Sequence, residues 1–358
     1  MSRVSSIPLH LRRAVLAGIA LVALALAAFA LSPFGGPRGD KSFGVLKLSG
    51  PVDDRNPLGV QVHKVVGSDV PADLYGSQVG ESQRSGSDLT GRLVTELAPI
   101  APEAYEAPVA RYIAYAERWT ARTRRHARTL HRELAAGDRR GAQAAWRATW
   151  SSYLHLGAVY GLFGDLDQAI DGMPGGLPRG AADPDFTGLH RIEKGLWTGE
   201  RPQALLPTQR KLERSLAALA AELPDTEIDP LDYRTRAHEI LEDAQRKLLT
   251  STDVPWSGEG VLGTAALLAA THQVIGTLEP LLQGRNNVLI QVQSDLRALD
   301  GAVAAIRRRH HGHLPTLNGL GRAERARLNG TMTTALAALA FVPPSIETAP
   351  SPVIPRIK

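Results

Sequence analysis

The feature that most constrains the fold is an apolar stripe with helical spacing that recurs in several segments after about residue 100. Apolar residues at steps of three and four place their side chains along one side of a helix. Gly137-Asp138 and the Gly- and Pro-rich residues 173–185 interrupt this pattern, as residues that end helices do. Aromatic residues make up only 5% of the chain, which favours helices packed through Leu and Ala over a β-sandwich. The sequence therefore predicts an all-α fold of antiparallel helical bundles. The stripes lie in residues 203–221, 262–282, 288–306 and 325–341.

A single hydrophobic helix is expected at the N-terminus, over residues 14–31. This run carries no charge and follows Arg12 and Arg13, so the positive-inside rule places the rest of the chain outside the cytoplasm. Its length is about the minimum that spans a bilayer, yet Ala28-Phe29-Ala30 also fits a signal cleavage site. The expected localisation is the cell membrane, with one anchor and an extracytoplasmic main domain, or export after cleavage.

Four regions follow from composition. Residues 1–31 are the signal peptide or transmembrane anchor, and residues 32–99 are a linker with a small irregular segment. Two runs in that segment, 43–48 and 60–66, lean towards β-structure. Residues 100–345 are the helical domain, and residues 346–358 form a Pro-rich tail.

Charge and residue usage exclude several functions. The net charge is +5, and the basic residues are scattered rather than gathered beside aromatic residues, so nucleic acid is not an expected partner. The chain has no cysteine, which excludes thiolate ligands, cysteine nucleophiles and disulfides. No Gly-rich phosphate-binding loop of the Gly-x-x-x-x-Gly-Lys type is present.

The segment around His190 and Glu193 is the strongest candidate for chemistry. Two residues three apart on a helix share a face, so the imidazole and the carboxylate can meet one cation. Nitrogen and oxygen donors of this kind suit iron, zinc or manganese. Taken alone, the His-x-x-Glu pattern is also the pattern of an ordinary hydrogen bond on a helix surface.

Two sequence blocks resemble the imelysin family and its EfeO-like, iron-uptake branch. Gly188-Leu189-His190-Arg191-Ile192-Glu193 matches the family's Gly-x-His-x-x-Glu motif. Upstream, residues 163–171 (Phe-Gly-Asp-Leu-Asp-Gln-Ala-Ile-Asp) are similar to a second family block. The resemblance covers roughly residues 100–345.

The resemblance implies an imelysin-like pair of helical bundles that binds iron outside the cytoplasm and passes it on. The implied cargo is ferrous or ferric iron, with zinc as a second option, and the implied partners are a membrane iron permease and a peroxidase-type protein. It implies an accessory protein, not an enzyme. Residues 43–98 contain one histidine, His63, and no cysteine or methionine, so they cannot form the copper-binding domain found in some members.

Several ligand positions of the family are changed in this chain. Leu154 and Gly157 align with two glutamates, and Gly258 and Gly260 align with a histidine and an aspartate. His155 and Glu259 each lie one position from an expected ligand and could complete the site with His190 and Glu193. The alternative is a degenerate imelysin-fold interaction or scaffold protein that no longer binds metal.

Other polar motifs are weaker candidates. His238-Glu239-Ile240-Leu241-Glu242 approaches the His-Glu-x-x-His signature of zinc peptidases, but the second histidine is replaced by Glu242, so exposed helix polarity is expected there. A metallopeptidase is therefore the least favoured function. The aspartates at 165, 167 and 171 are explained at least as well by N-capping and loop structure as by metal binding.

Overall fold

The computed structural model describes residues 46–47, 61–62 and 97–348, and these fall into two separate units, 1–93 and 94–358. The predicted hydrophobic helix at 14–31 and the tail beyond Thr348 lie outside the described residues. In the first unit, strand β1 (Leu46–Lys47) pairs antiparallel with β2 (Gln61–Val62), and Leu46 is opposite Val62. Both strands fall in the two runs that the sequence marks as β-leaning.

The second unit is helical, apart from one isolated bridge between Ile100 and Thr348, in the part of it that the structure describes. This confirms the all-α prediction for that region. The long helices are α3 (Glu106–Ala136), α4 (Arg139–Leu154), α6 (Gly188–Thr198), α7 (Leu206–Glu222), α8 (Pro230–Asp243), α9 (Gly260–Leu282), α10 (Val288–Arg309) and α11 (Arg322–Leu339). Shorter elements are η1 (Pro102–Tyr105), η2 (Gly157–Val159), α5 (Asp165–Asp171), η3 (Pro174–Gly176), η4 (Gly180–Ala182), η5 (Pro202–Leu205), η6 (Leu223–Asp225), the π-helical turn η7 (Ala244–Leu248), η8 (Leu317–Gly319) and α12 (Val342–Ser345).

The turn between α3 and α4 shows how the sequence sets the helix ends. Gly137 ends α3 in the left-handed conformation, with φ of 77°, which a glycine adopts at little cost. Asp138 then caps α4, because its side chain accepts a hydrogen bond from the backbone N–H of Gly141 at 3.0 Å. This two-residue connection folds α3 and α4 into an antiparallel hairpin.

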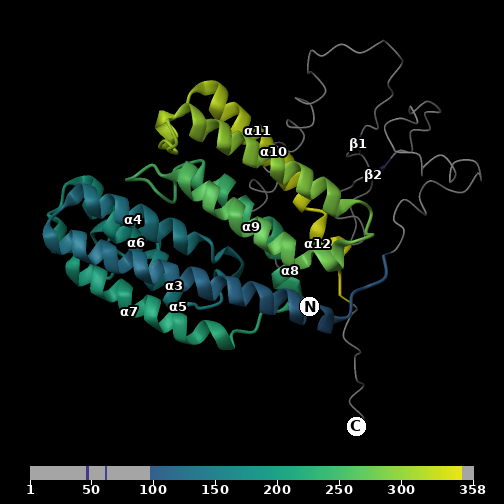
Figure 1. The fold of residues 1–358 in the computed structure, drawn as a ribbon, viewed down its shortest axis with the longest axis horizontal. Helices are drawn as coiled ribbons and strands as arrows, with labels where there is room; N and C mark the ends of the chain where they lie inside the picture. The colour runs from purple at the N-terminus through teal and green to yellow at the C-terminus, as the bar shows by residue number, and fades with distance from the viewer. Residues whose placement is uncertain (1–45, 48–60, 63–96, 349–358) are drawn as a thin grey trace, which may run out of the picture. The chain divides into compact units, whose positions relative to one another are not determined.

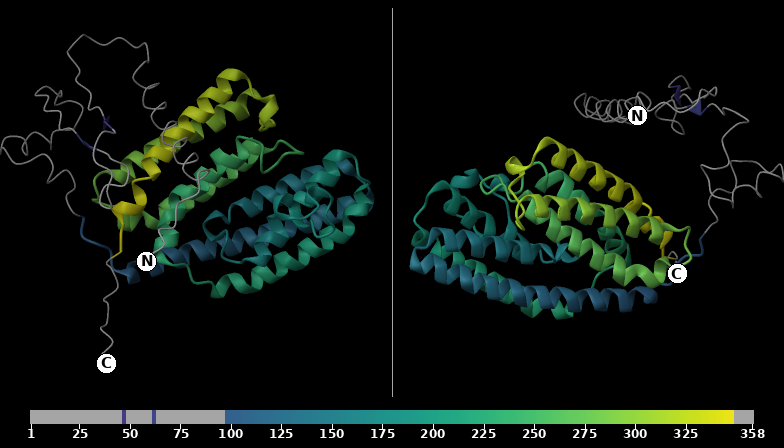
Figure 2. Two further views of the ribbon diagram at one scale, coloured as in Figure 1. Left: turned by 180° about the vertical axis from the view of Figure 1, so that it is seen from behind. Right: turned by 45° about the horizontal axis from the view of Figure 1, so that its top comes forward.

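The helices form two groups on either side of α9. Helices α3, α4, α6 and α7 pack together in one group, and α10 packs with α11 in the other. Helix α9 contacts α3, α4, α8 and α10, and it lies between the two groups in Figure 1 and in both views of Figure 2. It is therefore the central helix of the unit.

Helix α9 is long and apolar enough to cross a membrane, the only such helix among the described residues. Most of its residues are buried by other helices of the unit, including Leu268, Val274 and Leu278. We therefore interpret α9 as the core helix of the bundle. Its apolar character comes from being surrounded by protein on most sides.

The predicted apolar stripes form the core. Buried stripe residues are Leu205, Leu212, Leu216 and Leu219, Leu267, Leu268, Val274, Ile275 and Leu278, Val292, Leu296, Leu299, Val303 and Ile306, and Leu328, Met332, Leu336 and Leu339. Ile346, the first residue of the predicted tail, is also buried, and its carbonyl accepts a hydrogen bond from the hydroxyl of Tyr105.

Candidate metal centre

His190 and Glu193 lie one turn apart on α6, and both side chains are 0% exposed. The helix starts at Gly188, whose φ is 76°. A Cβ at this glycine would lie 2.4 Å from the carbonyl oxygen of Ile170, at the end of α5. Only glycine permits this close approach, which brings the start of α6 against the last turn of α5.

The carboxylate of Glu193 is held at both oxygens. One oxygen, Oε2, lies 3.0 Å from Nδ1 of His190, and the other accepts a hydrogen bond from the backbone N–H of Ser257 at 2.8 Å. Ser257 belongs to the connection between η7 and α9, so this bond ties α6 to that connection. Glu193 therefore fixes the orientation of the imidazole ring through Nδ1.

The other ring nitrogen of His190 faces Asp171, the last residue of α5. Nε2 lies 3.3 Å from Oδ1 of Asp171, close enough for an ion pair. The geometry is not that of a hydrogen bond, so both atoms are buried without a hydrogen-bond partner in the described part of the chain. Burial alone would lower the pKa of His190, but the charge of Asp171 and the contacts with Asp171 and Glu193 raise it well above its usual value. His190 therefore lies between two acidic side chains whose contacts favour the protonated form of its ring.

Asp171 also lines a pocket of about 460 Å³ beside α5. Asp253, from the connection between η7 and α9, lies on the pocket wall. Burial is the main reason that the pKa of Asp253 is raised to about 6. The nearby charge of His190 lowers this pKa, and the charges of Asp171 and Glu193 raise it further. The pocket therefore carries an excess of carboxylate groups close to His190. Its other lining residues include Tyr153, Leu154, Tyr160, Asp167, Gln168, Asp243 and Lys247.

The structure gives His155 and Glu259 partners other than His190 and Glu193. His155 stacks on Trp119, with 3.4 Å between ring centroids, and its Nδ1 lies 2.6 Å from the hydroxyl of Tyr115. Burial and Arg122 lower its pKa to about 4. Glu259 accepts a hydrogen bond from Nε of Arg147 at 2.5 Å. Their assignment as metal ligands stays a prediction that these contacts do not support.

No group of three or more His, Asp or Glu side chains within the described ranges is arranged to hold a metal ion. Packing blocks one of the changed family positions, Gly260, and restricts another, Gly157. A Cβ at Gly260 would lie 2.1 Å from the carbonyl oxygen of Leu248, and one at Gly157 would lie 3.2 Å from Ile240. A ligand side chain at either position would not fit without movement of these neighbours.

Of the two structural explanations for the aspartates of α5, N-capping is wrong, and a role in the loop is confirmed for Asp167. The N-cap residue of this helix is Gly164, which has no side chain to cap it. Asp167 instead accepts hydrogen bonds from the backbone N–H groups of Gly161 and Phe163, and so holds the preceding loop. Asp171 faces His190. The matched block at residues 163–171 pointed to this segment, but no sequence pattern indicated that Asp171 contacts His190 or that Asp253 lines the same pocket as Asp171.

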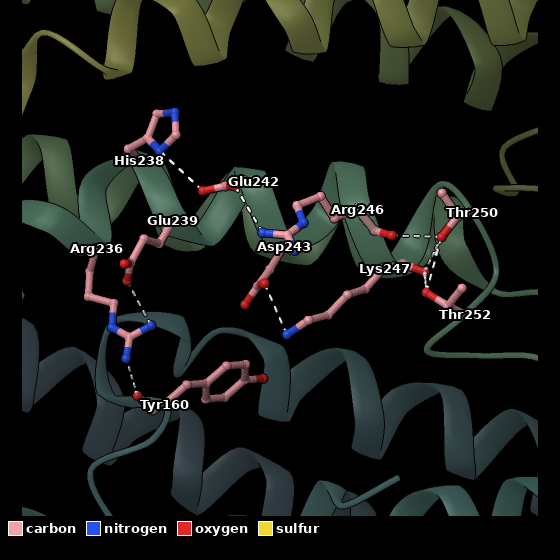
Figure 3. A network of polar contacts seen from close by, with 10 residues as sticks. All are labelled: Tyr160, Arg236, His238, Glu239, Glu242, Asp243, Arg246, Lys247, Thr250 and Thr252. Carbon is pink, nitrogen blue, oxygen red and sulfur yellow. Dashed lines mark hydrogen bonds and ion pairs between the residues drawn. The ribbon is translucent and has the colours of Figure 1, made fainter. Parts of the chain in front are cut away.

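The zinc-peptidase-like segment is a row of ion pairs along one helix. Figure 3 shows His238 beside Glu242, 3.6 Å away, and Arg246 beside the same glutamate at 3.1 Å. Lys247 pairs with Asp243 at 3.0 Å in the same view. All are partly exposed pairs at i,i+4 spacing, as the sequence predicts for a solvent-facing helix.

Comparison with known proteins identifies the family of the helical region. The family Peptidase_M75, described as Imelysin, matches residues 108–340, more than half of the chain. The chain belongs to the imelysin family. The chain is also similar to proteins named "Iron uptake system component EfeO" from Escherichia coli (strain K12) and from Shigella flexneri, each 25% identical over 201 residues. That stretch is 56% of this chain and 53% of the relatives, so the chain spans about half the length of the relatives that it matches.

Proposed function

We propose that this chain is an extracytoplasmic iron-binding accessory of an iron-uptake system, acting by coordination and transfer rather than by catalysis. The observation that carries the proposal is the fully buried His190, whose Nε2 faces Asp171 at an acidic pocket without a hydrogen-bond partner. Membership of the imelysin family and similarity to proteins named as iron-uptake components support it.

In this proposal the cation enters between His190 and Asp171. A metal ion takes the place of the proton that the imidazolium holds at Nε2, because a ligating imidazole must be neutral. Glu193 keeps the ring oriented through Nδ1, in the manner of carboxylates that support metal-bound histidines. Asp253 is a further acidic group on the pocket wall whose charge interacts with that of His190, and movement of these side chains is needed to gather them around one ion.

The test is metal titration of the purified full chain in detergent, by calorimetry with iron and with zinc. We expect His190→Ala to abolish binding and Glu193→Gln to weaken it by about 10- to 100-fold, the usual effect of losing a supporting carboxylate. The matched control is His272→Ala, which removes a histidine paired with Asp300 at 2.8 Å on the surface. This control should leave metal affinity unchanged.

The second candidate is an interaction or scaffold protein with a decayed site. The observation that favours it is the packing at Gly260, where a side chain would clash with the backbone carbonyl of Leu248. Absence of iron and zinc binding by the unmodified chain would establish this alternative. A metallopeptidase would require metal-dependent cleavage of an unstructured peptide that Glu193→Gln abolishes.

The proposed location is the outer side of the cell membrane, with residues 14–31 as anchor or cleaved signal and an iron permease and a peroxidase-type protein as partners. The net positive charge before residue 14 and the apolar run support this orientation. Membrane fractionation and the mass of the mature chain distinguish the two forms: an anchor leaves full-length protein in the membrane, and cleavage releases a shorter soluble chain. Full-length protein in the cytoplasm would contradict both.

A further inference from the structure

A tyrosine hydroxyl lies at the acidic pocket without a hydrogen-bond partner. Tyr160 lines the pocket, and its hydroxyl oxygen is buried although part of the residue is exposed. Its ring stacks on that of Tyr153, with 5.3 Å between centroids. The hydroxyl of Tyr153 has a partner, Asp167, at 3.3 Å. Tyr160 therefore offers the pocket an oxygen that nothing else in the described residues engages.

The groups around this oxygen are mainly anionic. Asp171 and Asp253 both lie on the same pocket wall, and the charges of both add to the effect of burial in raising the pKa of Tyr160 well above its usual value. Lys247 is the positive side chain on the wall, but it pairs with Asp243 at 3.0 Å and is half-exposed. The fully buried Nε2 of His190 lies 3.3 Å from Oδ1 of Asp171.

Among the described residues, no three His, Asp or Glu side chains are arranged to hold a metal ion. The phenol oxygen of Tyr160 is a further donor at this pocket. We propose that this pocket binds iron in the ferric state, with the phenolate of Tyr160 as a ligand beside Asp171, Asp253 and Nε2 of His190. The inference rests on the proposed function and specifies the oxidation state of its cargo.

Charge balance favours a trivalent ion. Asp171, Asp253, the phenolate of Tyr160 and the supporting carboxylate of Glu193 carry four negative charges when the imidazole is neutral, and Fe³⁺ compensates three of them. A divalent ion would leave two of these charges uncompensated in a partly desolvated pocket, which is more costly. Hard cations also prefer anionic oxygen ligands. Binding releases the phenol proton of Tyr160 and the proton on His190 to solvent, because a bound cation displaces protons from its ligands.

The experiment adds ferric nitrilotriacetate to the full chain in detergent and records the visible absorption spectrum. A phenolate bound to Fe³⁺ gives a ligand-to-metal charge-transfer band that carboxylates and imidazole do not give. We expect this band in the unmodified chain and its loss in Tyr160→Phe, with at least a tenfold fall in ferric affinity. Zinc affinity should stay within twofold, because a divalent ion does not need the phenolate.

The matched control is Tyr233→Phe, the same change at a buried tyrosine whose hydroxyl pairs with Thr277 at 2.5 Å outside the pocket. This variant should keep the band. Resonance Raman spectra of the unmodified ferric protein, which contain phenolate vibrations only when a tyrosine binds the iron, make the test independent of how well the variants fold.

Ferric binding with no charge-transfer band, or a band that Tyr160→Phe keeps in full, would overturn the assignment of Tyr160. If such a protein still binds iron and loses it in His190→Ala, the proposed function stands without the phenolate. If the unmodified chain binds neither iron nor zinc, both proposals fail.

Discussion

At the residue scale, Glu193 and Asp171 contact different nitrogens of the His190 ring and therefore have different roles in the site. Glu193 is fixed by the backbone N–H of Ser257, so it can only orient the ring through Nδ1. Asp171 is 17% exposed and borders the pocket, so the Nε2 side is the one that an ion can reach. A helix that carries His and Glu three apart therefore presents one ligand and one supporting residue, rather than two equal ligands.

His155 gives a prediction about acid stability. Its pKa is lowered to about 4 by burial and by Arg122, below the usual 6.5. The unfolded chain therefore binds the proton more readily, and the stability due to neutral His155 is present at pH 7 and is lost as the pH falls from about 6.5 towards 4. At pH 4.5 this loss is about 2–3 kcal/mol.

Urea unfolding of the unmodified chain and of His155→Gln, each at pH 7 and at pH 4.5, measures this effect. The variant lacks the titrating group, so its loss of stability between the two pH values should be smaller by about 2–3 kcal/mol. Equal losses in the two proteins would contradict the prediction.

At the scale of elements, the site is assembled where α5 ends against the start of α6. The backbone of Gly188 lies so close to the carbonyl of Ile170 that no side chain fits between them. Asp171 is the residue after Ile170, and His190 lies two residues after Gly188. The contact between the two helices therefore sets the distance between the side chains of Asp171 and His190. The glycine of the Gly-x-His-x-x-Glu motif thus has a positional role in the metal centre.

Gly188→Ala should destabilise the protein by about 2 kcal/mol or more, because it combines a left-handed backbone with a clash against backbone atoms. It should also weaken metal binding by separating α5 from α6. Thermal or urea unfolding and the metal titration measure the two effects.

The matched control is Gly276→Ala, on α9, where a Cβ would meet nothing within 4 Å. This change should stabilise the protein by about 0.5–1 kcal/mol, because alanine favours the helix over glycine. If both substitutions changed the free energy of unfolding by a similar amount, Gly188 would not be needed for the close approach of α5 to α6.

At the scale of the whole helical unit, α9 joins the two groups of helices. Its apolar side chains face both groups, so neither group has a complete core without it. The same helix begins directly after the connection that carries Asp253 and Ser257. The core and the metal centre are therefore coupled through one element, and the unit should unfold as one cooperative structure.

Leu278→Ala should lower the free energy of unfolding by about 2–5 kcal/mol, since Leu278 is fully buried at the centre of the unit and the change leaves a cavity. Urea unfolding should still show one transition. Leu231→Ala, at a leucine that is 53% exposed, is the control and should change stability by less than about 0.5 kcal/mol. Two separate transitions in the Leu278→Ala protein would show that the groups fold independently.

The sequence by itself determined the helices and half of the site. Apolar spacing located α7, α9, α10 and α11 because one buried face must repeat with the helical period. Gly137-Asp138 marked a helix boundary because glycine and aspartate satisfy exposed helix ends. His190 and Glu193 could be paired because residues three apart on a helix are neighbours in any fold.

Only the tertiary structure decided what surrounds this pair. Asp171, Asp253 and Tyr160 come from separate elements, and no local pattern states which elements will touch. Their approach depends on the packing of α5, α6 and the connection before α9, which the core imposes on the whole unit. Periodicity is a property of a short segment and can be read along the chain, whereas a pocket is a property of distant segments brought together by burial of their apolar faces.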